Sequence, residues 1–342
     1  MRGRRVIGGL ILGMASVAGP GTVAPALHPW DAEGPAPQPV LFAPGTISTG
    51  DDEAHATFSP DGRRLFYIKD SPDFRHWTIV GVDWTARGWG EPEVASFSGR
   101  FGDADLSFAP DGKVVYFVST RPVKTGGAEK ADTDLWRIPI GEGGGWGEPE
   151  RVVELSSDGN EWFPNATNDG WLYFGSERRE GNLGPEGTSD LWRARLVGNR
   201  FTAPENLGPV VNTRGNDIEP WISADGRLLI FASAGRPDTR GSYDLYVSHR
   251  CGESWTEPLN LGDRVNSPSW EFGARPTPDL RFLFFTSNRA LTDRPLDRRL
   301  TFRELTDRIR APGNGLRDIY RVELTALDLA SRCPGPAPAR SR

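Results

Sequence analysis

The sequence has few of the residues from which cofactor sites and many catalytic sites are built. It contains two cysteines and four histidines among 342 residues. It has no glycine-rich phosphate loop and no Cys/His set with the spacing of a metal site. With so few histidines, a Ser-His-Asp hydrolytic triad is not expected. These absences argue against nucleotide-binding, metal-dependent and triad-based enzymes, and we expect no cofactor.

The sequence also lacks a net positive charge and long apolar segments. The formal net charge is −6, which gives no general attraction to nucleic acid or to an anionic membrane surface. The apolar stretch from Val6 to Ala18 follows Arg2, Arg4 and Arg5 and is too short to span a bilayer. We therefore expect residues 1–26 to be a signal peptide of a periplasmic or secreted protein, with no membrane span after cleavage. An uncleaved membrane anchor is the alternative.

Turn-forming and aromatic residues, by contrast, are abundant. The 41 glycines and 29 prolines predict frequent turns, and 12 tryptophans and 17 phenylalanines can supply a core. One phrase recurs five times, and its first copy, Glu53 to Gly62, reads Glu-Ala-His-Ala-Thr-Phe-Ser-Pro-Asp-Gly before an apolar run. Such a repeat is typical of a propeller or an array. The turn aspartates follow one another at intervals of 50 to 58 residues, at Asp61, Asp111, Asp169, Asp225 and Asp279.

Each repeat can be divided into four short strands. They are the phrase itself, the apolar run after the turn, a segment that begins Asp-Leu-Trp or a variant of it, and a proline-led segment. The fifth repeat lacks its proline-led segment, which residues 39–49 can supply from the N-terminal side. We therefore predict an all-β, five-bladed β-propeller of four-stranded blades over residues 39–330, closed by the N-terminal strand. Residues 27–38 are expected to be a linker, residues 331–342 a C-terminal tail, and residues 300–310 a helical insertion in the last blade.

The repeats resemble those of TolB-type β-propellers. The resemblance rests on Phe58-Ser59-Pro60-Asp61-Gly62, on Tyr116-Phe117-x-Ser119-x-Arg121 and on the Asp-Leu-Trp or Asp-Leu-Tyr segments. It implies the propeller fold and says little about function. TolB has six blades and an N-terminal domain that binds periplasmic partners, whereas five repeats are found here. Ser248 to Trp255 is also similar to the Asp-box of sialidases, with Arg250 in place of the key aspartate.

The phrase places an acidic residue eight positions before each turn aspartate. Because the phrase should form the innermost strand, these acids are expected in a ring at the upper mouth of the channel, beside the loops between second and third strands. A second, incomplete tier lies six positions before the turn, at His55, Asp105 and Glu219. The two tiers are predicted to bind ligand, as a cation site with calcium as a candidate or as an acid/base cluster. Alternatively, each acid is bound within its own repeat. The ring consists of Glu53, Asp103, Glu161, Asp217 and Glu271.

Basic residues also recur. Arginines end the second strand in four repeats, and an aspartate opens the third strand of each, so ion pairs between these hairpin neighbours are expected. An anion-binding cluster is the alternative, and Arg289 is counted among the predicted ligand-binding residues. The arginine-rich helix at 300–310 is expected either to cap the upper mouth or to pack on a neighbouring blade. The expected pairs are Arg121 with Asp134, Arg178 with Asp190, Arg236 with Asp244 and Arg289 with Asp318.

The two cysteines should lie at the bottom of adjacent blades. After export Cys251 and Cys333 can form a disulfide, and a free pair is the alternative. Together these features favour an exported, monomeric binding or scaffold protein of the cell envelope without catalytic residues, whose partner is a glycan, a peptide or a protein. The alternative is a carbohydrate-active hydrolase or lyase that uses channel acids such as Glu53, Asp105, Glu161 and Glu271.

Overall fold

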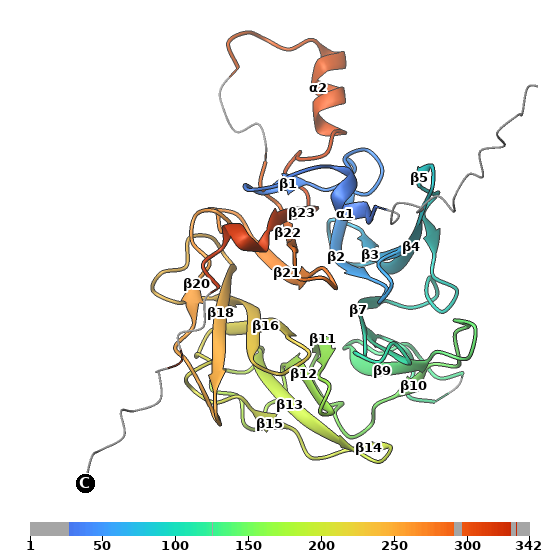
Figure 1. Cartoon of the computed structure of the whole chain (residues 1–342), viewed down its shortest axis with the longest axis vertical. Coiled ribbons are helices and arrows are strands. Elements are labelled where there is room, and N and C mark those ends of the chain that lie inside the picture. The colour runs from blue at the N-terminus through green and yellow to red at the C-terminus, as the bar shows by residue number, and fades with distance from the viewer. Residues whose placement is uncertain (1–26, 125, 291–295, 330–332, 334–342) are drawn as a thin grey trace, which may run out of the picture.

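The five repeats form five β-sheets arranged as blades around a central axis. The structure, a computed structural model, describes residues 27–124, 126–290, 296–329 and 333. The blades follow one another around the ring in chain order (Figure 1). The predicted all-β, five-bladed propeller is therefore confirmed. The signal peptide expected at residues 1–26 lies outside the described residues, and none of the described helices is long and apolar enough to cross a membrane.

Within each blade the first three strands are hydrogen-bonded in chain order from the axis outward. The innermost strands are β2 (Asp52–Phe58), β7 (Asp103–Phe108), β11 (Glu161–Ala166), β16 (Asn216–Ile222) and β21 (Glu271–Pro276). The second strands are β3 (Arg64–Asp70), β8 (Val114–Ser119), β12 (Trp171–Ser176), β17 (Leu228–Ala234) and β22 (Phe282–Ser287). The third strands are β4 (Trp77–Thr85), β9 (Asp134–Pro139), β13 (Asp190–Val197), β18 (Asp244–Cys251) and β23 (Asp318–Glu323).

The outer edges of the blades are short strands. In the first four blades they are β6 (Glu93–Val94), β10 (Glu150–Arg151), β15 (Glu205–Asn206) and β20 (Leu259–Asn260). In three of these blades the third strand also forms a small hairpin, with β5 (Gly88–Trp89), β14 (Arg200–Phe201) and β19 (Ser254–Trp255). Short edge strands leave little unpaired backbone exposed to other chains.

The N-terminal part of the chain closes the ring. Strand β1 (Val40–Leu41) pairs antiparallel with β23 of the last blade, with Val40 opposite Arg321 and Leu41 opposite Tyr320. The Ser48 hydroxyl adds a hydrogen bond of 3.0 Å to the carbonyl oxygen of Ile319. The first blade is thus fastened to the last, as the borrowed strand predicts, and the fifth blade has a paired outer edge.

Residues 27–38 differ from the expected linker, because they pack against the propeller. Helix α1 (Pro29–Ala32) places the Trp30 ring in the core, where it is 1% exposed and meets the Phe58 ring edge-on at 4.7 Å. The Trp30 indole N–H donates to Asp279 Oδ2 at 3.1 Å. The prolines suggested an extended linker, but one buried aromatic side chain is enough to fix this short segment.

The apolar core lies where neighbouring blades pack face to face. The second strands contribute the largest share of it, and residues such as Val115, Phe117 and Leu229 are fully buried. Phe42 and Phe284, from opposite ends of the chain, pack edge-on at 4.7 Å. The central strands of each blade are therefore covered on both faces, which positions the inner strands rigidly around the axis.

The lower face carries the turns that join the first two strands of each blade. In four of these turns the residue after the aspartate is a glycine with φ between 68° and 87°, which glycine adopts without a Cβ clash. In the fifth turn Leu280 occupies this position with φ of 56°, and its side chain is 55% exposed. The last turn is therefore strained relative to the other four.

The insertion in the last blade contains helix α2 (Phe302–Ile309). Its N-terminus has a capping box in which Thr301 and Glu304 satisfy each other's backbone N–H groups. None of its residues is buried, and the helix stands away from the ring (Figure 1). The exposed helix therefore adds no side chain to the core, and its C-terminal end approaches the backbone at Gly50, which precedes β2 of the neighbouring first blade.

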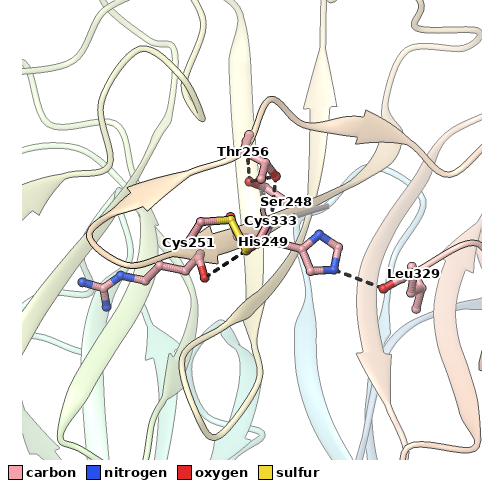
Figure 2. The surroundings of a disulfide bond; sticks show 7 residues. Ser248, His249, Cys251, Thr256, Leu329 and Cys333 are labelled. Atoms are coloured by element: carbon pink, nitrogen blue, oxygen red, sulfur yellow. Dashed lines mark hydrogen bonds between the residues drawn. A yellow bond between two sulfur atoms is a disulfide. The ribbon is translucent and has the colours of Figure 1, made fainter. Parts of the chain in front are cut away.

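A disulfide joins Cys251, at the end of β18, to Cys333 beyond the last blade, with 5.4 Å between their Cα atoms. Figure 2 shows it beside His249, whose Nε2 lies 3.1 Å from the carbonyl oxygen of Leu329. The bond and this contact fasten the segment after β23 to the fourth blade. The 82 residues between the two cysteines make this a long-range cross-link.

Candidate functional site

Each acid of the predicted ring is the first or second residue of the innermost strand of its blade, and all five are fully buried. Glu271 shows the pattern: it accepts from the backbone N–H and hydroxyl of Ser267 at 2.8 and 2.6 Å, and from the Ser287 hydroxyl at 2.8 Å. Arg289 Nη2 donates to the same carboxylate at 2.9 Å. In every blade a Ser or Thr from the preceding crossing and a base that ends the second strand hold the acid. The pairs are Glu53 with Lys69, Asp103 with Arg121, Glu161 with Arg178, Asp217 with Arg236 and Glu271 with Arg289.

These contacts turn the ring acids away from the channel. Both oxygens of each carboxylate are occupied by groups from its own repeat or the adjoining crossing. Burial raises the pKa of Asp103 to about 6 and that of Glu161 to about 7, while Arg121 and Ser157 respectively oppose the shift. The geometry is that of a structural contact repeated in each blade.

The expected pairing of the arginines with the aspartates of the third strands is wrong. Arg121 Nη1 lies 2.6 Å from Asp103 Oδ1, in the first strand of its blade. The other three arginines likewise form an ion pair with the ring acid of their own blade. The third-strand aspartates have other partners, because the fourth strand brings a polar side chain to them. Those partners are Arg151 for Asp134, Asn206 for Asp190 and Asn260 for Asp244, while Asp318 accepts from the Gly313 N–H.

The second tier converges on one point in the channel. His55 Nδ1 lies 2.6 Å from Asp105 Oδ1, and its Nε2 lies 3.2 Å from Glu219 Oε1. The three side chains come from the first, second and fourth blades, so together they bridge the axis. We call them the channel triad. Burial by itself would lower the pKa of His55, but Glu219 and Asp105 outweigh it and raise that pKa to about 10.

A shared backbone feature aims these side chains inward. In each blade the register between the first and second strands is interrupted at this position. Such a bulge redirects a side chain relative to its neighbours. All five equivalent residues have left-handed backbone, with φ of 58° at His55, 59° at Asp105, 50° at Phe163, 57° at Glu219 and 63° at Gly273.

The two remaining residues at this repeat position bind the carboxylates of the channel triad through their backbone N–H groups. The Phe163 N–H donates to Asp105 Oδ2 at 2.9 Å, and the Gly273 N–H donates to Glu219 Oε2 at 2.6 Å. A Cβ at Gly273 would lie 2.5 Å from His55 Cδ2, so only glycine leaves room for the imidazole. Each carboxylate therefore holds the imidazole with one oxygen and a backbone N–H with the other.

Arg275 lies below the channel triad and balances its charge. Its guanidinium stacks on the Phe163 ring, with Cζ 3.9 Å from the ring centroid, and Nη1 donates to Ser107 Oγ at 3.2 Å. Burial lowers the pKa of Arg275 to about 10, against the opposing effect of Asp105 and Glu219. The positive charges of His55 and Arg275 thus balance the negative charges of Asp105 and Glu219. A compact charged cluster occupies the middle of the channel.

A cavity of about 380 Å³ opens above the channel triad, and we call it the upper cavity. Its walls are mostly aromatic. The Trp77 and Trp162 rings lie 5.9 Å apart, and the Tyr243 and Trp270 rings meet edge-on at 6.4 Å. Phe272 packs edge-on against His55 at 5.5 Å. The upper cavity is therefore a concave aromatic site with a charged floor, as small-molecule sites commonly are.

Charged side chains also line the wall of the upper cavity. Arg317 lies between Asp52 and Asp70, at 2.7 and 2.5 Å from their carboxylates, and its guanidinium covers the Phe74 ring at 3.8 Å. Burial raises the pKa of Asp70 to about 6, which Arg317 opposes. Glu177 accepts from Asn160 Nδ2 at 2.7 Å and from the indole N–H of Trp162 at 3.4 Å.

A second cavity, also of about 380 Å³, lies on the lower face. It is lined by the turn residues of the repeats, such as Pro60, Pro110 and Pro278, and by Arg275. The channel triad and Arg275 lie between the two cavities. A ligand at the upper face is therefore separated from the lower face by charged and hydrogen-bonded side chains.

Only part of the predicted site lies in the upper cavity. His55, Asp105 and Glu219 line it, whereas Arg289 and the five ring acids do not. Sequence reasoning missed the aromatic wall, although Trp162 follows Glu161 directly and Trp270 precedes Glu271. A tryptophan next to the ring acid in two of the five repeats was thus an available signal. Within the part of the chain that the structure describes, no three His, Cys, Asp or Glu residues form a group that could hold a metal ion.

Three solved structures illustrate what the fold is similar to. TolB from Acinetobacter baumannii is 13% identical, with a TM-score of 0.44, over 79% of this chain and 54% of that one. A putative TolB from Agrobacterium tumefaciens is 16% identical, with a TM-score of 0.46, over 80% of this chain and 91% of that one. An alpha-L-arabinofuranosidase from Lactobacillus brevis is 12% identical, with a TM-score of 0.49, over 82% and 91% of the respective chains.

These similarities concern the fold alone. The chain spans about half the length of the Acinetobacter TolB. No family model matches the sequence, and no curated protein matches it. The predicted resemblance to TolB-type propellers is confirmed as a likeness of fold.

Proposed function

We propose that the protein is an exported, monomeric binding protein of the cell envelope that does not catalyse a reaction. Its upper cavity binds a small ligand, or part of a glycan, peptide or protein partner. The observation that carries the proposal is the upper cavity itself. It is concave, its walls are aromatic, and variable loops of the upper face surround it.

The state of the channel acids supports binding over hydrolysis. A glycoside hydrolase needs one carboxyl group to donate a proton and another to act as base or nucleophile beside the substrate. In Asp105 and Glu219, one carboxylate oxygen contacts His55 and the other accepts a hydrogen bond from a backbone N–H. The ring acids Glu161 and Glu271 are buried outside the cavity. The carboxylates nearest the axis are therefore committed to holding the structure together.

Two features favour export. Residues 1–26 have the charge and apolar pattern of a signal peptide. The bond between Cys251 and Cys333 is of a kind that persists in oxidising compartments such as the periplasm.

The proposal is tested by screening the protein on glycan and peptide arrays and, in parallel, on chromogenic glycosides. Two variants are tested beside the wild type. The double variant Trp162→Ala/Trp270→Ala changes the upper cavity, and the control Trp84→Ala changes a tryptophan near the C-terminal end of β4, outside the cavity. Saturable binding that is lost in the double variant and kept in Trp84→Ala supports the proposal. Turnover of a glycoside that depends on Asp105 or Glu219 overturns it, as does binding that the double variant leaves unchanged.

A further inference from the structure

We propose that the ligand of the upper cavity carries an organic cation, an alkylammonium or guanidinium group, bound between the aromatic wall and the side chains of Glu177 and Asp70. The inference rests on the proposed function of the cavity as a binding site. It narrows the ligand to a chemical class that neither the repeat pattern nor the fold identifies.

The first argument is an imbalance of charge in the wall. The channel triad is balanced by Arg275 from below, so it leaves no net charge at the floor. Arg317, which lines the wall, forms ion pairs with two carboxylates, those of Asp70 in the lining and of Asp52 behind it. Asp52 is 2% exposed, and its Oδ2 is buried without a hydrogen-bond partner among the described residues. One negative charge in this trio therefore has no cation of its own.

Glu177 provides a second excess charge. Its contacts are an amide and an indole N–H, both neutral donors, and no basic side chain of the described residues forms an ion pair with it. A carboxylate that is partly desolvated beside aromatic rings is stabilised by a cation. Glu177 and the trio around Arg317 thus each carry one unmatched negative charge, which a cation bound in the cavity would compensate.

The aromatic wall suits the same ligand. The faces of tryptophan and tyrosine rings attract ammonium and guanidinium groups, most strongly where water is excluded. The protein already uses this contact beside the cavity, where the Arg317 guanidinium lies 3.8 Å from the centroid of the Phe74 ring. Trp77, Trp162, Tyr243 and Trp270 offer further rings around the opening. A neutral sugar could stack on these rings but would leave the excess negative charge unmatched.

The test compares choline with 3,3-dimethylbutanol, its uncharged isostere, by isothermal titration calorimetry on the full protein. Choline is expected to bind saturably and at least tenfold more tightly than the alcohol. Glu177→Gln should weaken choline binding roughly tenfold, since it removes the charge and keeps the shape. The control, Glu205→Gln, removes the same charge from an exposed ion pair of the same blade and should leave binding unchanged.

Three results would overturn the inference: equal affinity for choline and its isostere, no saturable binding of choline, or an unchanged affinity in Glu177→Gln. These outcomes are separate from the proposed function. If the array screen finds a neutral glycan or an acidic peptide whose binding needs Trp162 and Trp270, the cavity remains a binding site and only the cationic class is wrong.

Discussion

Replacing His55 with glutamine should destabilise the whole propeller, because the imidazolium holds Asp105 and Glu219 across the channel. The substitution removes one of two cations and leaves two buried carboxylates facing Arg275 alone. Removing one partner of a buried ion pair typically costs about 3–5 kcal/mol. The pKa gives the same order: a value of about 10 against an ordinary 6.5 corresponds to about 4–5 kcal/mol, at about 1.36 kcal/mol for each pKa unit.

The assay is urea unfolding at several pH values, followed by circular dichroism. A raised histidine pKa means that the folded state binds the proton more tightly than the unfolded state. The contribution of His55 should therefore be complete below about pH 6.5 and disappear as the pH rises through about 10. Wild type and His55→Gln should differ most at about pH 6 and progressively less as the pH rises toward 10.

A charge-balanced variant distinguishes electrostatics from lost packing. His55→Gln combined with Glu219→Gln leaves Asp105 opposite Arg275, so it should recover more than half of the lost stability. A cost below about 1 kcal/mol for His55→Gln at neutral pH would refute the reasoning. The same holds if the difference from wild type does not change with pH, or if the double variant is less stable than the single one.

Four further outcomes are expected. Arg289→Ala should lower the free energy of unfolding by about 3 kcal/mol because Glu271 stays buried, while a role in ligand binding would instead appear as lost affinity at unchanged stability. Leu280→Gly should stabilise the protein by about 1 kcal/mol by relieving a left-handed leucine, and Leu280→Ala, which keeps the strain, should not. Replacing both Cys251 and Cys333 by serine should cost about 2–4 kcal/mol in chemical denaturation; no change would show that the cross-link does not constrain the unfolded chain. Choline affinity should fall as the pH drops through about 6 and Asp70, which faces Arg317, Asp52 and His55, takes up a proton; Asp70→Asn should remove this dependence.

The architecture was predictable because its determinants are local and repeated. The Asp-Gly turns at Asp61 and its equivalents mark each blade, and the missing strand of the fifth repeat points to residues 39–49. A count of repeats and one unpaired edge were enough to infer the closed ring. The packing of Trp30 was not predictable in this way, because a proline-rich segment carries no periodic pattern that would reveal one anchoring side chain.

The site was predicted less well, for a geometric reason. Spacing from the turn placed Glu271 and His55 at the correct height along the inner strand. It did not reveal which way each side chain points, and the bulge at His55 reverses the expected alternation. The ring acids were therefore expected to face the channel when they are turned into the blades. Glu177 occupies the variable position of the Ser-x-Arg pattern that ends the second strand, and Arg317 directly precedes the third strand, so the repeat places both positions but does not specify their residue types.

Closure of the ring by β1 has a consequence for how the chain folds during synthesis. Strand β1 is among the first described segments to be made, and its partner β23 is among the last. Each of the first four blades can form locally as its hairpins are completed, but Val40 and Leu41 must wait unpaired for nearly the whole chain. Among the strand pairings of the described residues, this one has the longest sequence separation, and such contacts are slow to form. Ring closure is thus the expected rate-limiting step of folding, and truncation within the last blade would leave both the first and the final edges open to other chains.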